Sequence, residues 1–301
     1  MNIAKNRYIK ESTSDLVFDI VIRVIAVIIV LLVFYPLIYV VSASLSNPLA
    51  ITRGQVWLLP KELTLSAYKR VINNQDILIG YKNTIIITVV GTAINIFMTI
   101  IFAYPLSKKD LVGRNVITIF ITFTMFFNAG MIPNYLLIRD LKLLDNIWAL
   151  ILPGMISVYN MLIMRNYFQT SIPGELIEAA KIDGCTNIRT LAQVVLPLSK
   201  GILAVMVIFY AVGHWNAYFN AMMYLTSKEK FPLQVVLRQI LQQSQLLKED
   251  STLGSNMAES TLAFVSVQYA IIVFASIPIL ILYPFLQKYF VKGVMIGAIK
   301  G

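Results

Sequence analysis

Long apolar segments alternate with shorter polar ones along this chain. Six predominantly apolar runs lie near 20–43, 83–107, 115–138, 146–164, 201–226 and 262–287. Each exceeds about 18 residues, which at about 1.5 Å per helical residue is enough to cross the hydrocarbon core of a bilayer. The runs are continuously apolar rather than alternating, so helices are favoured over the strands of a barrel. The pattern predicts an all-α membrane protein with six transmembrane helices, organised as a single domain over 1–301.

The polar segments between the runs indicate the orientation. An even number of crossings places both termini on the same side of the membrane. If that side is the cytoplasm, slightly more than half of the 25 Lys and Arg residues lie inside, which has the sign of the positive-inside rule. Residues 166–200 then form an inside loop, and 44–82 and 227–261 form outside loops. The outside loops are either simple surface loops or, as their length suggests, docking sites for an external partner.

Composition supports a membrane protein and argues against several other classes. Of the 301 residues 58% are hydrophobic and 13% are charged, with a mean hydropathy of +0.74, whereas a soluble domain carries about 25% charge. The net charge of +10 is explained by basic residues at lipid headgroups, so no nucleic-acid partner is expected. One Cys and one His exclude an internal disulfide and argue against a metal cluster. Residues 24–52 carry no charge, too long a run for a cleavable signal, so the first span is retained.

The inside loop has the signals of a short helix, a turn and a second helix. Pro173 favours a helix start, and Glu175 and Glu178 lie early, where acids interact well with the helix dipole. Gly184 is suited to the left-handed conformation that closes a helix. Thr186 is expected to cap a second helix running through Leu191, and Pro197 to end it.

This loop resembles the EAA loop of ABC-importer permeases. The shared pattern is Glu178-Ala179-Ala180, three residues, Gly184, nine residues, and then Val194-Val195-Leu196-Pro197, with Val194 where the family has Ile. The resemblance implies a coupling helix that seats on a cytoplasmic ATPase. The residues it assigns to this contact are Glu178, Ala179, Ala180, Asp183, Gly184 and Pro197. An ordinary amphipathic loop is the alternative interpretation.

The resemblance extends over essentially the whole chain. Residues 35–46 are similar to the end of the first span of MalG-like carbohydrate permeases, and Trp215-Asn216-Ala217-Tyr218-Phe219 to an element of their fifth span. Residues 128–136 and the tail 292–301 resemble the LplC/YtcP subgroup, associated with complex oligosaccharides. Cys185 replaces a frequent Ala, and Asn216-Ala217 stands where Asn-Asp is common, which weakens the transfer of any sugar contact.

The resemblance implies a type I ABC importer permease fold and a transport subunit that is not itself an enzyme. It would form half of a pseudo-symmetric heterodimer with a second homologous permease in the bacterial cell membrane. The other implied partners are two copies of a cytoplasmic ATP-binding subunit, an extracytoplasmic sugar-binding lipoprotein, an oligosaccharide substrate and the lipid bilayer. No cofactor is expected in this chain, because ATP and Mg would bind the ATPase subunits.

The fifth apolar run contains the residues most suited to meeting a sugar. Tyr210, His214 and Tyr218 recur every four residues and would share one helix face, while Asn216 and Asn220 would share another, about 200° away from His214. One face is expected to border the substrate pathway and the other to pack on helices, or all of them only tie helices together. The candidates for the pathway are Tyr210, His214, Trp215, Asn216, Tyr218 and Asn220.

The main alternative is a self-sufficient secondary transporter. Such a carrier favours acids within its spans, but the six cores contain none. No G-x-x-x-x-G-K-[ST] stretch is present, so phosphates would not be bound in that way by this chain. A membrane-embedded enzyme is a third option, without visible catalytic motifs such as H-E-x-x-H or G-x-S-x-G.

Overall fold

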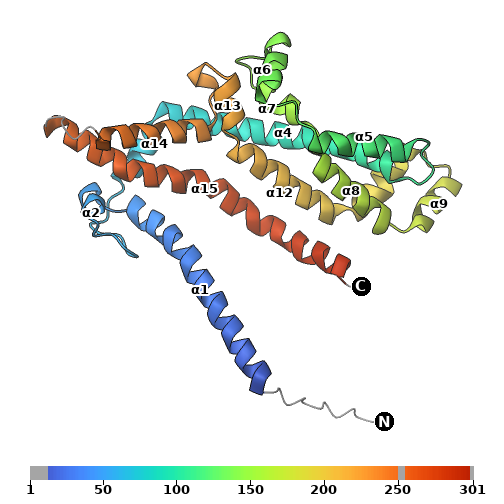
Figure 1. Ribbon diagram of the computed structural model, residues 1–301, viewed down its shortest axis with the longest axis horizontal. Coiled ribbons are helices and arrows are strands. Elements are labelled where there is room, and N and C mark those ends of the chain that lie inside the picture. Colours follow the sequence, from blue (N-terminus) through green and yellow to red (C-terminus); the bar gives the residue numbers. More distant parts are fainter. Residues whose placement is uncertain (1–12, 250–254, 299–301) are drawn as a thin grey trace. The chain divides into compact units, whose positions relative to one another are not determined.

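The computed structural model describes residues 13–249 and 255–298, and within these ranges all regular elements are helical (Figure 1). The all-α prediction is confirmed for this part of the chain. The elements are α1 Thr13–Ser44, α2 Pro48–Thr52, α3 Ser66–Asn73, α4 Gln75–Ser107, α5 Arg114–Phe126, α6 Met131–Asp140, α7 Trp148–Ile151, the 3-10 turn η1 Leu152–Gly154, α8 Val158–Thr170, α9 Gly174–Ile182, α10 Asn187–Thr190, the π-helical turn η2 Leu191–Val195, α11 Leu196–Leu198, α12 Lys200–Asn216, α13 Phe219–Tyr224, the 3-10 turn η3 Lys228–Lys230, α14 Leu233–Glu249 and α15 Ser255–Ala298.

The chain packs as two compact units. One comprises the described residues up to Val71 together with those of 246–273. The other comprises Ile72–Gln245 and the described residues from Phe274 onward.

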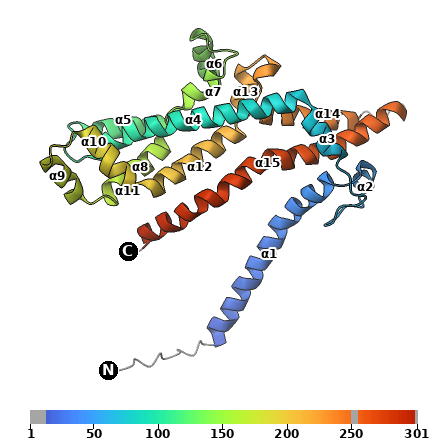
Figure 2. The same ribbon diagram turned by 180° about the vertical axis from the view of Figure 1, so that it is seen from behind.

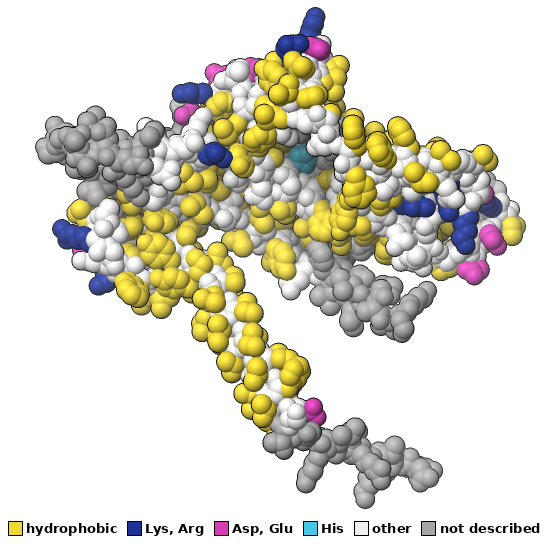
Figure 3. All heavy atoms as spheres, viewed as in Figure 1, with side chains coloured by type: hydrophobic (Ala, Val, Ile, Leu, Met, Phe, Trp, Pro, Cys, Tyr) yellow, Lys and Arg dark blue, Asp and Glu magenta, His cyan; other side chains and the backbone are white. Residues whose placement is uncertain are grey.

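In the first unit, α1 is apolar around its whole circumference. None of its 18-residue apolar window is buried, and Figure 3 shows hydrophobic side chains along it. A helix that is hydrophobic on all sides requires an apolar environment, which a bilayer supplies. Near its start, Asp19 and Arg23 form an exposed i,i+4 ion pair.

Serines fasten the following loop onto the end of α1. Ser42 Oγ donates to the carbonyl of Leu58, and the Lys61 amide donates to Ser46 Oγ. Beside them, Tyr39 contacts Tyr269 edge to face at 5.8 Å between ring centroids. The polar part of the 35–46 motif therefore organises the loop rather than facing solvent.

The second unit is built around α4, which packs along α12 and α8 (Figures 1 and 2). Its main core is lined by Ala103, Tyr104 and Leu106 of α4, by Met161 and Met164 of α8, and by Met206 and Tyr210 of α12. Partly buried side chains from the 166–200 segment join this core, including Ile177 and Leu191. The segment is therefore attached to the ends of the long helices.

The predicted spans are helical, but three of them are not continuous. Among the described residues, only Ser14–Ser44, Gln75–Ser107 and Phe264–Pro284 are single helices long and apolar enough to cross a membrane. The helices α5 and α6 are bent by 109° and α7 and α8 by 49°. The helix α12 is bent by 84° from the preceding segment Asn187–Leu198, which belongs to the predicted inside loop. The predicted span 115–138 is divided between α5 and α6, because Phe127 is extended and Gly130 has φ +93°. The predicted span 201–226 is likewise divided between α12 and α13, since α12 ends at Asn216 and Ala217 is extended. Of the 292–301 tail, residues 299–301 lie outside the described part of the chain.

Candidate functional site

The best-defined exposed motif of the second unit is helix α9 and the turn after it. Pro173 with φ −59° precedes the helix, and Glu175 lies in its first turn. At the other end Gly184 takes φ +75°, as its sequence position predicts. The Gly184 amide donates to the carbonyl of Lys181 and the Cys185 amide to that of Ala180. This pair of bonds is the Schellman arrangement, which closes the helix with a left-handed residue.

The residues predicted to contact an ATPase differ in their exposure. Ala180 is buried, which attaches α9 to the unit. The other predicted contact residues are exposed: Glu178, Ala179, Asp183, Gly184 and Pro197. Large apolar side chains accompany them, with Ile182 87% exposed and Ile188 80% exposed. Acidic, small and apolar groups together on one segment suit a protein interface better than free solvent.

The second helix of the segment ends within one residue of the predicted position, but its winding is irregular. Thr186 caps it as expected, because its side chain accepts from the Arg189 amide. From Leu191 the helix widens into the π-helical turn η2, and it ends at Leu198, directly after Pro197. Pro197 cannot donate to the carbonyl of Gln193 four residues earlier, and the widened turn lies directly before it. Pro197 is thus accommodated by the wider turn that precedes it, and the chain bends only after Leu198.

Two charged residues of the α4–α5 loop support this segment. Asp110 pairs with Lys181 of α9 at 3.5 Å, and Lys108 donates to the side chain of Asn187 at the start of α10. The Lys108 ammonium also lies 4.8 Å from the centroid of the Tyr104 ring. A hydrogen bond from its own backbone and then the nearby Lys181 hold the pKa of Asp110 below its usual range. Sequence reasoning missed both contacts, since a Lys-Lys-Asp loop signals charge but no partner.

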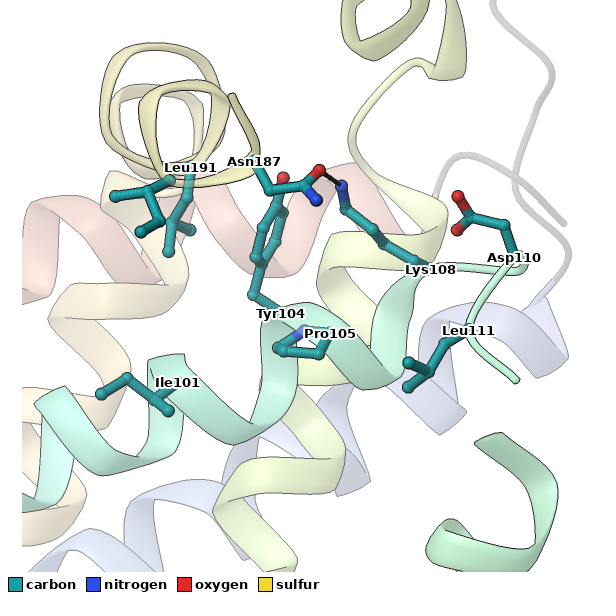
Figure 4. A pocket seen from close by; sticks show the side chains of 9 residues that line it. Ile101, Tyr104, Pro105, Lys108, Asp110, Leu111, Asn187 and Leu191 are labelled. Carbon is teal, nitrogen blue, oxygen red and sulfur yellow. Dashed lines mark hydrogen bonds between the residues drawn. The ribbon is translucent and has the colours of Figure 1, made fainter. Parts of the chain in front are cut away.

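A cavity of about 480 Å³ separates α4 from the start of α10 (Figure 4). Figure 4 shows Tyr104 and Lys108 on the α4 side, with Asn187 and Leu191 facing them. The hydrogen bond from Lys108 to Asn187 crosses this cavity and joins the start of α10 to the end of α4.

The candidate pathway residues on α12 mostly face other helices. Tyr210 OH lies 2.7 Å from Thr99 Oγ1, and His214 Nε2 lies 2.6 Å from Asn95 Oδ1, both on α4. The Asn95 amide group donates in turn to the carbonyl of Gly154 at the bend before α8. Trp215 of the same helix is buried, donates to the carbonyl of Ala275 and contacts Tyr81 edge to face.

The break after α12 separates Tyr218 from that face. The inference that Tyr210, His214 and Tyr218 share one helix face is wrong for Tyr218, because α12 ends two residues earlier. Asn216, Tyr218 and Asn220 are all exposed in this chain, while Tyr210 is buried. Asn216, Tyr218 and Asn220 are therefore the pathway candidates whose side chains are accessible to a ligand or partner.

A second polar cluster, also missed from the sequence, ties the loop before α7 to the loop after α13. The Asp145 carboxylate accepts from the amides of Thr226 and Ser227 and from Lys230 Nζ at 2.6 Å. The hydrogen bond from Lys230, followed by those from Ser227 and Thr226, holds the pKa of Asp145 well below its usual range. Asp145 has φ +54°, a conformation that Asp tolerates better than most residues.

Replacing Asp145 by Ala is expected to loosen residues 224–230. The variant removes the acceptor of two amides, so hydrogen exchange at Thr226 and Ser227 should become severalfold faster. Because the folded pKa lies below the ordinary value of about 4, the protection should be present at all pH values above that and be lost only as the pH falls further. Asp140→Ala, which removes only a contact to neighbouring Arg139, is the control. Equal exchange in both variants would contradict the cluster's role.

Comparison with known proteins places this architecture among transport proteins. A family model described as binding-protein-dependent transport system inner membrane component matches residues 95–296. Protein LplC of Bacillus subtilis (strain 168) is 43% identical over 266 residues, which is 88% of this chain and 89% of that protein. The polygalacturonan/rhamnogalacturonan transport system permease protein YtcP of the same organism is 39% identical over 94% of this chain and 98% of its own length.

A solved structure is similar over nearly the same extent. It is the crystal structure of a bacterial ABC transporter involved in the import of the acidic polysaccharide alginate. One of its chains superposes with a TM-score of 0.84 at 40% sequence identity, covering 93% of this chain and 99% of that chain.

Proposed function

This chain belongs to the family of binding-protein-dependent transport system inner membrane components, and from that membership we propose the role of a permease subunit that imports acidic oligosaccharides. It is a helical membrane component of the type I ABC permease fold and of the carbohydrate-permease kind. In the proposal it forms half of the translocation pathway beside a second homologous permease. Two ATP-binding subunits dock on its cytoplasmic side, and an extracytoplasmic lipoprotein delivers the sugar.

The substrate class rests on the named substrates of two relatives. A relative with 40% identity over 93% of this chain imports the acidic polysaccharide alginate, and a second, with 39% identity, is named for polygalacturonan, which is also built from uronic acids. Oligosaccharides carrying carboxylates are therefore the proposed cargo. The family membership does not favour the alternative of a self-sufficient secondary transporter.

Six crossings are proposed: the three continuous helices, the bent pairs α5 with α6 and α7 with α8, and α12, whose 84° bend from the segment Asn187–Leu198 leaves that segment outside the membrane. This arrangement leaves both termini in the cytoplasm, on the same side as α9 and α10. Broken spans are compatible with a membrane only where the interrupted backbone is buried in protein or borders water. They are thus expected to meet the partner permease or the pathway rather than lipid.

Uptake by the reconstituted complex tests the function. Proteoliposomes containing both permeases and the ATPases, supplied with the cognate binding protein, should accumulate labelled oligogalacturonate only when ATP is enclosed on the ATPase side. Uptake driven by an ion gradient without ATP would support the secondary transporter instead. ATP-driven uptake restricted to neutral oligosaccharides would retain the permease role but overturn the acidic substrate.

Helix α9 is proposed as the coupling helix, with exposed Glu178 contacting the ATPase. Glu178→Ala is expected to weaken retention of the ATPase on purification about tenfold, because removing one partner of a charge contact inside an interface leaves the other unpaired. Glu175→Ala is the matched control, as a second exposed acid on the same helix. Equal retention in the parent and both variants would leave Glu178 as a residue that only interacts with the helix dipole.

A further inference from the structure

Arg238 stands over the break between α12 and α13. Its guanidinium carbon lies 4.8 Å from the centroid of the Tyr218 ring, a cation–π contact. Tyr218 is one of the two residues that interrupt the helix, and its side chain is 39% exposed. A planar guanidinium and an aromatic ring are thus brought together from two elements at an irregular point of the fold.

The start of α14 is firmly fixed, which sets the position of Arg238. The Leu233 amide donates to Thr84 Oγ1 of α4, and Val236 approaches Gly80 so closely that a Cβ there would lie 3.1 Å from its Cγ2. Val235 packs with Ala221 and Leu225, which places α13 beside this end of α14 (Figure 2). The arginine therefore projects from an anchored helix rather than from a mobile loop.

The guanidinium has unused hydrogen-bonding capacity. Among the described residues, the ion pairs are Asp19–Arg23, Arg139–Asp140, Asp110–Lys181 and Asp145–Lys230, and no protein group in this range accepts a hydrogen bond from Arg238. The contact with the Tyr218 ring occupies none of the N–H donors through a side-chain oxygen, so these donors remain for a ligand. The N–H edge of a guanidinium matches a carboxylate in a two-point geometry, which a lysine does not reproduce.

Neutral polar groups stand close by in sequence on both sides of Tyr218. Asn216 and Asn220 are exposed, and Asn216 uses its amide nitrogen on the carbonyl of Val212, which leaves its side-chain oxygen to accept. An aromatic ring, amide groups and a guanidinium edge are the combination that recognises a sugar ring bearing a carboxylate. A neutral sugar would use the first two and leave the arginine without a partner.

We propose that Arg238, braced by the Tyr218 ring, binds the carboxylate of uronic acid units and determines the preference of this permease for acidic over neutral oligosaccharides. The inference rests on the proposed function, which supplies the acidic cargo. It adds a residue from the 227–261 loop to the exposed pathway candidates Asn216, Tyr218 and Asn220 at the break.

Reconstituted transport with a matched pair of sugars tests this role. The probes are trigalacturonate and the corresponding neutral trisaccharide made by carboxyl reduction, each at a concentration that saturates the binding protein. Arg238→Gln is expected to lower uptake of the acidic sugar about tenfold, the effect of losing a charge-assisted hydrogen bond, and to leave any uptake of the neutral sugar unchanged. Arg238→Lys should retain part of the acidic uptake, because it keeps the charge but not the two-point geometry.

The controls separate other roles of the same residue. Arg139→Gln removes a different exposed arginine and should leave acidic uptake unchanged. Stimulation of ATP hydrolysis by the loaded binding protein should stay at the parental level in Arg238→Gln; a parallel fall would show a docking contact and overturn the proposal. If Arg238→Gln takes up the acidic sugar at the parental rate, the role of Arg238 is overturned while the proposed function stands. A parent complex that transports only the neutral sugar would overturn the acidic substrate and, with it, this role.

Discussion

A Gly184→Asp variant is expected to insert at parental levels and to lose nearly all binding-protein-dependent uptake. Gly184 has φ +75° in the turn that closes α9, where side-chain-bearing residues are strained by about 1–2 kcal/mol. The strain is modest for Asp, and a Cβ at this position meets no atom of the chain within 4 Å. The large effect is expected from the proposed interface, where the new carboxylate would be buried against the ATPase without a partner.

Gly113→Asp is a closely matched control for that variant. Gly113 has φ +76°, and a Cβ there also meets nothing within 4 Å. It precedes α5 and lies outside the α9–α10 segment. Uptake should be measured for both variants at equal membrane content, together with the ATPase that copurifies. Equal losses would assign the effect to backbone strain, and normal uptake by Gly184→Asp would overturn the coupling role of α9.

A Gly91→Ala variant is expected to lower the thermal stability of the detergent-purified permease and to reduce its transport. The added Cβ would stand 2.5 Å from His214 Nε2. That ring is held by Asn95, so it cannot move without breaking the 2.6 Å contact. Overpacking of this kind destabilises by about 1–3 kcal/mol, and an interhelical hydrogen bond within a membrane contributes about 0.6 kcal/mol more.

The helix α12, which carries His214, provides a control for this overpacking. Gly213→Ala lies next to His214 on α12, where a Cβ meets nothing within 4 Å, so it should be neutral or slightly stabilising. Gly91→Ala combined with His214→Ala should be no less stable than His214→Ala alone, because the ring that clashes is gone. Additive losses in the double variant would show that Gly91 and His214 do not meet in the folded protein.

Local patterns in the sequence predict the local structure well. The six apolar runs predict helices because lipid leaves backbone groups no other partner, and the structure has helices over each of them. Gly184 and Thr186 predict the turn between α9 and α10 because their chemistry acts within a few residues. The family could also be recognised from the resemblance of residues 178–197 to the EAA motif, since that pattern lies within 20 consecutive positions.

Contacts between distant residues were decided only by the tertiary structure. Four-residue spacing put Tyr218 on the face of His214, but spacing assumes an unbroken helix, and α12 ends at Asn216. His214 pairs with Asn95 across 119 positions, and Arg238 meets Tyr218 across a turn and two helices.

The sequence by itself thus determined the helices, the membrane environment and the capped turn of α9, because these follow from solvation and short-range hydrogen bonding. The tertiary structure alone decided which polar side chains of α12 make interhelical hydrogen bonds and which remain exposed where the helix ends. The physical reason is that a buried polar group must find a partner wherever the packing places one, and its position along the chain does not specify where that partner lies.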